Sequence, residues 1–184
     1  MRKLLRAVAA MACVSLSLSF PALAEGLRVQ SPGQRTQIEF ELADGGAARY
    51  RVLYRGRPVI ASSPLGLDLG ADGTLSQGLR LLGHDERAHD GRYVLPVGKT
   101  RQARDHYREL RVRLADAGGR RLDVLLRAYD DGVALRYVLP AAGQVRIRNE
   151  LTGFAFPRDY PCWALNLGRF GTSHEGEYDP IAAS

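Results

Sequence analysis

The chain has 184 residues, 45% of them hydrophobic and 25% charged, and its net charge is +6 at pH 7. Three basic side chains lie in the first 24 residues, so the remaining 160 residues carry only +3 and fit one domain with a substantial core. The basic side chains alternate with apolar ones and form no patch with aromatic platforms. This excludes a nucleic-acid-binding module.

The first 24 residues have the three parts of an export signal. Residues 2–6 include three basic side chains, residues 7–20 are largely apolar, and Ala22–Ala24 is a small-x-small cleavage site. Cleavage near Ala24 predicts a mature domain that begins at Glu25 and is periplasmic or secreted. The apolar stretch is shorter than the roughly 20 residues that span a membrane, so we expect no membrane association after cleavage.

Residues 26–156 alternate between apolar and polar side chains, which is typical of strands with one apolar face. The alternation begins in residues 37–42. Asp44–Gly46 then supplies a turn, and the alternation resumes in residues 50–54, which predicts a hairpin.

Two more hairpins are predicted further along the chain. Residues 110–114 and 122–126 have matching apolar positions on either side of the turn-forming residues 116–119. A third hairpin follows at once, because Asp130–Gly132 leads into the alternating residues 133–139.

Strands with one apolar face require a second sheet to cover that face. No helical period is sustained for the three turns of an average helix. We therefore predict an all-β domain over residues 25–157, a large antiparallel β-sandwich with strands of five to ten residues. In residues 158–184, prolines and glycines are expected to interrupt any regular ladder, so this stretch is interpreted as a connector.

Two stretches contain side chains that could carry chemistry but fit no known motif. His84–Asp90 has two histidines and three acids, yet on a strand His84 and His89 point to opposite faces, which favours a solvated loop or polar strand edge over a metal site. Gly98–Thr100 lacks the glycine that a phosphate-binding loop requires at position 93. A nucleophile elbow is also absent, so no catalytic residue is assigned.

The acidic pair Glu175 and Glu177 is the most suggestive carboxylate group. In a loop, one of them could donate an oxygen to calcium, but that ion takes six to eight oxygen ligands, so further ligands would have to come from elsewhere. A solvated acidic pair is the alternative. Trp163 is either a sugar-stacking platform or, as its residue type favours, a core or interdomain packing residue.

Several stretches carry a family resemblance when they are taken together. The most specific is Arg127–Tyr137, and His174–Tyr178 is similar to a Tyr-Glu-x-x-Tyr segment in which histidine replaces the first tyrosine. The others are Ser31–Gly33, Tyr50–Ile60, Ser63–Leu67, Gly98–Lys99 and Asp105–Leu110. From about residue 26 to its end, the chain resembles the N-terminal domain of glycoside hydrolase family 97, the bacterial α-glucosidases and α-galactosidases.

The resemblance implies a β-sandwich of the galactose-mutarotase type, followed in the family by a catalytic (β/α)8 barrel that this chain lacks. It implies an exported enzyme that removes terminal sugars from α-linked oligosaccharides or glycosides with the help of calcium. By motif position, Glu175 is the glutamate that the N-terminal domain donates to the calcium, with Glu177 as the alternate. The chain alone is expected to be inactive. Neither glucose versus galactose preference nor the stereochemical outcome can be predicted from it.

Two other classes stay open at this stage. One is a free-standing periplasmic carbohydrate-binding module, with Tyr160, Trp163 and Tyr178 as its aromatic platform. The other is an inert interaction or assembly domain.

Overall fold

The computed structural model describes residues 26–140, 144–168, 171, 173 and 175–182. The predicted export signal, residues 1–24, lies outside the described residues, and so does His174. The described residues form β-strands and two short 3-10 turns, Asp44–Gly46 and Gly70–Asp72, without an α-helix. Within these residues no helix is long and apolar enough to cross a membrane.

The first sheet has the order β1-β2-β3-β4, and all its neighbours are antiparallel. Its strands are β1 (Leu27–Gln30), β2 (Thr36–Ala43), β3 (Ala47–Tyr54) and β4 (Arg57–Pro64). Arg55 and Gly56 both have positive φ, 50° and 75°, as the tight two-residue turn between β3 and β4 requires. The predicted hairpin around Asp44–Gly46 is confirmed, since Phe40 pairs with Tyr50 across it.

The second sheet has the order β10-β9-β8-β7 and is also antiparallel. Its strands are β7 (Arg80–Val94), β8 (Gln102–Ala115), β9 (Arg121–Tyr129) and β10 (Gly132–Val138). Both predicted hairpins of this region are confirmed. Val112 pairs with Val124 across the first turn, and Leu135 pairs with Leu126 across the second.

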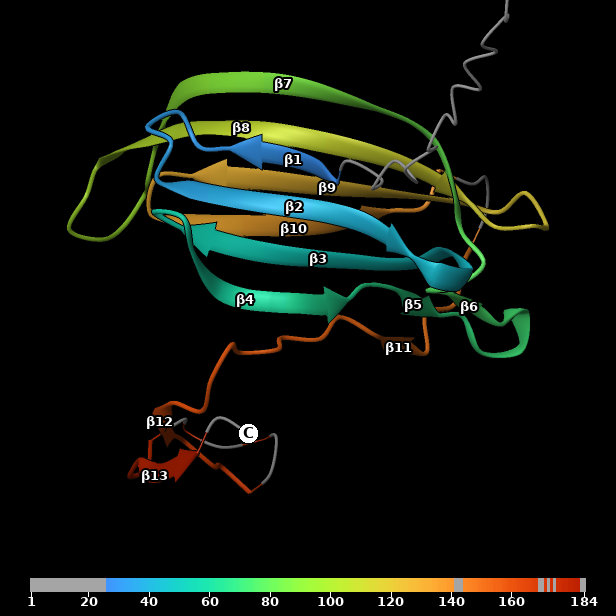
Figure 1. Cartoon of the computed structure of the whole chain (residues 1–184). Coiled ribbons are helices and arrows are strands. Elements are labelled where there is room, and N and C mark those ends of the chain that lie inside the picture. The colour runs from blue at the N-terminus through green and yellow to red at the C-terminus, as the bar shows by residue number, and fades with distance from the viewer. Residues whose placement is uncertain (1–25, 141–143, 169–170, 172, 174, 183–184) are drawn as a thin grey trace, which may run out of the picture.

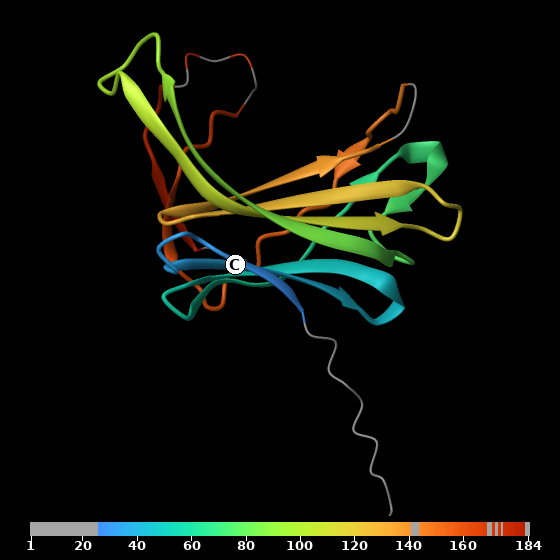
Figure 2. The ribbon, with the colours of Figure 1, turned by 90° about the horizontal axis from the view of Figure 1, so that it is seen from above.

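The two sheets pack face to face as two layers (Figure 1, Figure 2), which confirms the predicted antiparallel sandwich. Alternate side chains of both sheets point into one core, because successive residues of a strand face opposite sides. The largest fully buried apolar side chains are Val29, Ile38, Leu65, Leu75, Leu110, Val112, Leu114, Leu122, Val124 and Leu126.

Short strands close one end of the sandwich. β5 (Leu67–Asp68), β6 (Thr74–Leu75) and β11 (Asn149–Glu150) form a small sheet of order β11-β5-β6. The chain then runs along the edge of β4, where the Ala61 amide donates to the Ala155 carbonyl at 2.7 Å. The first sheet is therefore extended past β4 by an irregular segment, residues 151–155.

Two details of the prediction are wrong. β7 and β8 have 15 and 14 residues instead of at most ten, because strongly paired strands can continue beyond the core where their side chains remain solvated. In residues 158–184, β12 (Pro161–Ala164) and β13 (Asp179–Ala182) do form an antiparallel ladder. Pro161 begins the ladder and Pro180 lies within it; both are tolerated because each strand of a two-stranded sheet is an edge strand. Figure 1 shows this small sheet apart from the sandwich.

Candidate functional site

The small β12–β13 sheet carries the residues for which a site was predicted. Glu175 and Glu177 lie in the extended segment just before β13, and both are exposed. Gly176 between them lies close to Leu165, since a Cβ at that glycine would be 3.1 Å from Leu165 Cδ1. The two carboxylates are therefore available to a partner, and this domain's own core encloses neither of them.

The aromatic residues near this sheet differ in their exposure and contacts. Trp163 on β12 is 71% exposed and stands directly across from Pro180 on β13. Tyr160 instead packs edge-on against Phe156, with ring centroids 5.9 Å apart, and the Arg158 guanidinium covers it at 4.7 Å. Tyr178 is exposed. Trp163 and Tyr178 are thus the more exposed of the three aromatic residues of the predicted platform.

A complete metal site is absent from the part of the chain that the structure describes. No group of three or more histidine, cysteine, aspartate or glutamate side chains comes together there. Calcium requires six to eight oxygen ligands, so Glu175 and Glu177 fit the role of partial donors only.

The polar stretch His84–Asp90 lies on β7, the outermost strand of the second sheet, and its side chains are exposed. His84 pairs with Val112 and His89 with Tyr107, so the two imidazoles occupy opposite faces. The interpretation as a polar strand edge is confirmed. His89 belongs to a structural cluster, since its Nε2 is 3.5 Å from Asp105 Oδ2 and its ring lies 5.1 Å from the Tyr107 ring.

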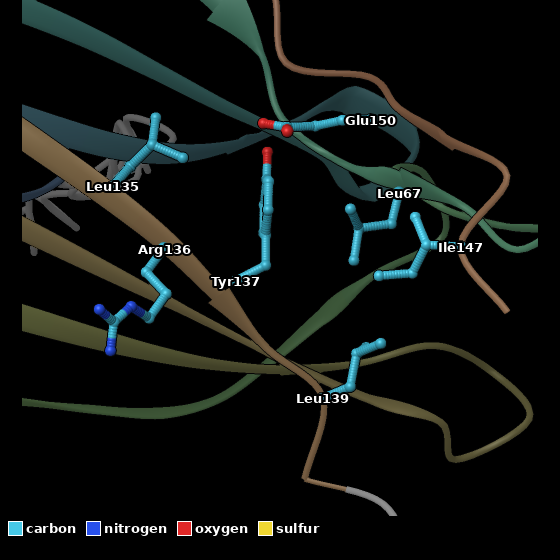
Figure 3. A pocket seen from close by; sticks show the side chains of 7 residues that line it. All are labelled: Leu67, Leu135, Arg136, Tyr137, Leu139, Ile147 and Glu150. Carbon is cyan, nitrogen blue, oxygen red and sulfur yellow. The ribbon is translucent and has the colours of Figure 1, made fainter. Parts of the chain in front are cut away.

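A hollow at the other edge of the second sheet was not predicted. It measures about 460 Å³ and lies beside β10 (Figure 3). Its lining residues are Leu67, Leu135, Arg136, Tyr137, Leu139, Ile147 and Glu150. The lining comes from residues 135–139, from residues 147–150 and from Leu67, which is distant from the other two in the sequence, so no local spacing signals the hollow.

A chain of hydrogen bonds holds the Tyr137 hydroxyl at the rim of this hollow. The Gly66 amide donates to that hydroxyl at 2.9 Å, and Thr152 Oγ1 donates to Glu150 Oε1 at 2.7 Å. Because the single threonine proton is committed to Glu150, Tyr137 must be the donor in its own 2.7 Å contact with Thr152. Burial raises the pKa of the Tyr137 hydroxyl above its usual value, which keeps it protonated as this chain requires.

The sandwich and its exposed acidic tail define an antiparallel β domain. The family model for the N-terminal domain of glycosyl hydrolase 97 matches residues 29–184. The chain belongs to glycoside hydrolase family 97 and corresponds to sequence from the N-terminal domain of its members.

Relatives and solved structures agree with this membership. A probable retaining α-galactosidase of Streptomyces bingchenggensis is 38% identical over 154 residues, which are 83% of this chain and 23% of that protein. A retaining α-galactosidase of Bacteroides thetaiotaomicron is 24% identical over 147 residues, which are 80% of this chain and 21% of that protein. The chain therefore spans about a quarter of the length of these relatives.

Among solved structures, a β-arabinopyranosidase superposes with a TM-score of 0.73 at 28% identity, covering 83% of this chain and 26% of that one. A family 97 enzyme of Pseudoalteromonas sp. strain K8 in complex with panose gives a TM-score of 0.68 at 25% identity, covering 75% and 22%. A family 97 enzyme of the same strain in complex with acarbose gives a TM-score of 0.75 at 23% identity. That match covers 84% of this chain and 24% of the other. These matches confirm the predicted fold class.

Proposed function

We propose that this chain is a non-catalytic part of an exported α-glycosidase, where it shapes one wall of the active site and donates Glu175 to a calcium ion. The observation that carries the proposal is the match to the family over residues 29–184, which includes the acidic tail. Relatives named as retaining α-galactosidases support an α-linked glycoside as the substrate of the whole enzyme.

The chemistry of the tail is compatible with this role. Glu175 is exposed on the segment before β13, so a carboxylate oxygen can reach a metal held mainly by another domain. A bound calcium ion would supply positive charge that orients carboxylates and substrate oxygens. Glu177 lies two residues further on and is the alternate donor.

The decisive experiment replaces the matched segment of the Streptomyces relative with residues 25–184 of this chain. We expect this chimera to hydrolyse an aryl α-galactoside only when calcium is present. Glu175→Gln should then raise the calcium concentration needed for half-maximal activity by at least about tenfold, because a charged ligand is lost. The matched control is Glu177→Gln, which should change this calcium concentration little.

If the two substitutions exchange their effects, Glu177 is the ligand. If neither changes the calcium requirement, the metal-donor role is wrong, even though family membership stands. Hydrolysis by residues 25–184 alone would overturn the non-catalytic role.

Export is a separate part of the proposal. Expression of the full chain in a Gram-negative host should deliver the protein to the periplasm with Glu25 as its new N-terminus. Retention of residues 1–24 on a cytoplasmic product would contradict it.

A free-standing sugar-binding module is the second candidate, and the exposure of Trp163 favours it. Titration with malto-oligosaccharides distinguishes the two functions, because stacking of a sugar on Trp163 changes indole emission. A saturable change in that emission, together with loss of binding in Trp163→Ala measured by isothermal titration calorimetry, would support the module. Unchanged emission at millimolar sugar would exclude it.

A further inference from the structure

A second hollow lies at the end of the sandwich away from β12 and β13, beside the turn between β5 and β6 (Figure 1, Figure 2). It measures about 580 Å³, and its lining includes Gly70–Asp72 and residues 146–148. Small-molecule sites commonly measure roughly 300–1,000 Å³, so this space is large enough to hold a small polar ligand.

The wall formed by Gly70–Asp72 is held by side chains that do not line the hollow. The Gly70 amide donates to Asp68 Oδ1 at 2.8 Å, which fixes the start of the turn. Arg120 Nε donates to Asp116 Oδ2 at 2.7 Å, and the same guanidinium donates to the Asp72 carbonyl. The shape of this wall therefore does not depend on a bound ligand.

The wall formed by residues 146–148 is fixed as well. The Arg148 amide donates to the Asp68 carbonyl at 2.8 Å, and the next residue, Asn149, pairs with Asp68 in the ladder between β11 and β5. Asp68 thus holds both walls, one through its side chain and the other through its backbone. Such a preorganised hollow loses little conformational entropy when a ligand binds.

The charged side chains of this hollow are not neutralised within the described part of the chain. Arg146 and Arg148 both line it, and neither guanidinium forms a hydrogen bond or ion pair with a described residue. Asp72 is the other charged lining residue, and its carboxylate has no such partner among the described residues either. Two guanidinium groups and one carboxylate leave an excess of one positive charge. The hollow therefore suits a ligand with one negative charge that also offers hydrogen-bond donors to Asp72.

We propose that this hollow binds a sugar acid, namely a uronic acid residue of an anionic polysaccharide. The planar fork of an arginine matches a carboxylate with two parallel hydrogen bonds, so Arg146 and Arg148 would hold the sugar carboxylate. Asp72 would accept hydrogen bonds from sugar hydroxyls, and the exposed Ile147 would pack against the apolar face of the sugar ring. The choice of a sugar rests on family membership, and the site is independent of the calcium proposal.

A uronic acid fits these groups better than an inorganic anion or a neutral sugar does. Sulfate has no hydroxyl to donate to Asp72, and the carboxylate would repel its double negative charge. A neutral sugar offers hydroxyls to Asp72 but leaves both guanidinium groups without an anion. Only a ligand that joins a carboxylate to neighbouring hydroxyls satisfies all three charged side chains.

Isothermal titration calorimetry of the full chain with trigalacturonic acid tests the proposal, and the uncharged methyl ester of the same trisaccharide is the matched probe. We expect saturable binding of the acid, and binding of the ester that is at least about tenfold weaker. Arg146→Gln and Arg148→Gln should each weaken binding of the acid at least about tenfold, because each removes charge-assisted hydrogen bonds. The control variant is Arg28→Gln on β1, which removes an exposed arginine away from the hollow and should leave the affinity unchanged.

A titration with sulfate separates a sugar-acid site from a general anion site. Asp72→Asn should lower the ratio of the affinity for trigalacturonic acid to the affinity for sulfate, because it weakens the contacts to hydroxyls and removes the repulsion of sulfate. An unchanged ratio, or equal affinities for sulfate and the acid in the original chain, would overturn the sugar-acid assignment.

The substituted side chains are all exposed, so every variant should fold with a nearly unchanged thermal midpoint. The proposal is also overturned if the acid shows no saturable binding, if the ester binds as tightly as the acid, or if Arg28→Gln weakens binding as much as Arg146→Gln does. The titrations contain no calcium, so their outcome is independent of the role proposed for Glu175.

Discussion

Glu109 of β8 and Arg127 of β9 stand opposite each other on the outer face of the second sheet, with Arg127 Nε 2.6 Å from Glu109 Oε2. The other carboxylate oxygen is 2.7 Å from Arg87 Nε of β7. The Glu109 side chain is only 3% exposed, because these two guanidinium groups cover it. A buried charge is tolerated only when it is paired and hydrogen-bonded, so Glu109 ties three strands together.

Glu109→Gln should lower the free energy of unfolding by roughly 2–3 kcal/mol at pH 7, since it removes the charge from two buried hydrogen bonds. Urea unfolding checks this value. The control is Asp90→Asn, which weakens the solvent-exposed Arg104–Asp90 pair and should leave the urea midpoint nearly unchanged. Equal losses of unfolding free energy in the two variants would contradict the idea that burial makes the Glu109 ion pairs more stabilising than the exposed one.

The same carboxylate should contribute to acid sensitivity. Burial acts to raise the pKa of Glu109, but hydrogen bonds from Arg127 and Arg87 outweigh it, and the pKa lies below the ordinary value of 4.5. A depressed carboxyl pKa stabilises the fold above the unfolded-state value, and this stability is lost as the pH falls through the folded-state value.

Urea midpoints measured between neutral pH and pH 3 test this effect. The stability difference between the original chain and Glu109→Gln should be constant above pH 4.5 and should shrink below it. Taking the difference removes the contribution of other carboxyls. A difference that is constant down to pH 3 would contradict the assignment.

Neighbouring glycines in the β2–β3 turn should respond differently to alanine. Gly45 and Gly46 both have positive φ, 72° and 70°, so alanine at either position costs about 1–2 kcal/mol of backbone strain. A Cβ at Gly46 would also clash with the Leu79 carbonyl oxygen, whereas one at Gly45 meets nothing within 4 Å. Gly46→Ala should therefore lower the thermal midpoint clearly more than Gly45→Ala, as calorimetry would show.

The hairpins of this fold could be predicted because each is encoded locally. Residues 110–114 and 122–126 present apolar side chains at alternate positions, and the turn between them contains the glycines that reverse the chain. Because every second side chain of these strands is apolar, each sheet needs a second sheet to cover its apolar face. The structure has two such facing sheets.

The alignment of the two sheets could not be predicted, because it depends on which strands face each other across the core. The hollow beside β10 has the same origin, since Leu67, Tyr137 and Ile147 meet only after the sheets have packed. The pairing of Trp163 with Pro180 joins two strands across a segment of irregular composition, where no alternation signals it. Glu175 is predicted as a calcium ligand from a motif. The structure adds that its side chain is exposed.

The segment beside β4 is held by backbone hydrogen bonds and also by one buried tyrosine hydroxyl. Tyr50 Oη donates to the Gly153 carbonyl at 3.0 Å, so Tyr50→Phe leaves the ring in the core but removes this anchor. We expect a loss of about 1 kcal/mol, together with faster hydrogen exchange confined to residues 151–155. Tyr54→Phe is the control, because its side chain is exposed. Faster exchange throughout the sandwich would contradict a local anchor.

Trp163 is the only tryptophan of the chain, so its fluorescence reports on the β12–β13 sheet alone. Since it is largely exposed, Trp163→Ala should change the free energy of unfolding by less than about 0.5 kcal/mol. Acrylamide should quench the indole efficiently in residues 25–184. In a chimera that retains no other tryptophan, quenching should fall sharply, because interdomain packing would cover the ring. Equal quenching in the two proteins would show that Trp163 faces solvent in the whole enzyme and would leave sugar contact as its remaining role.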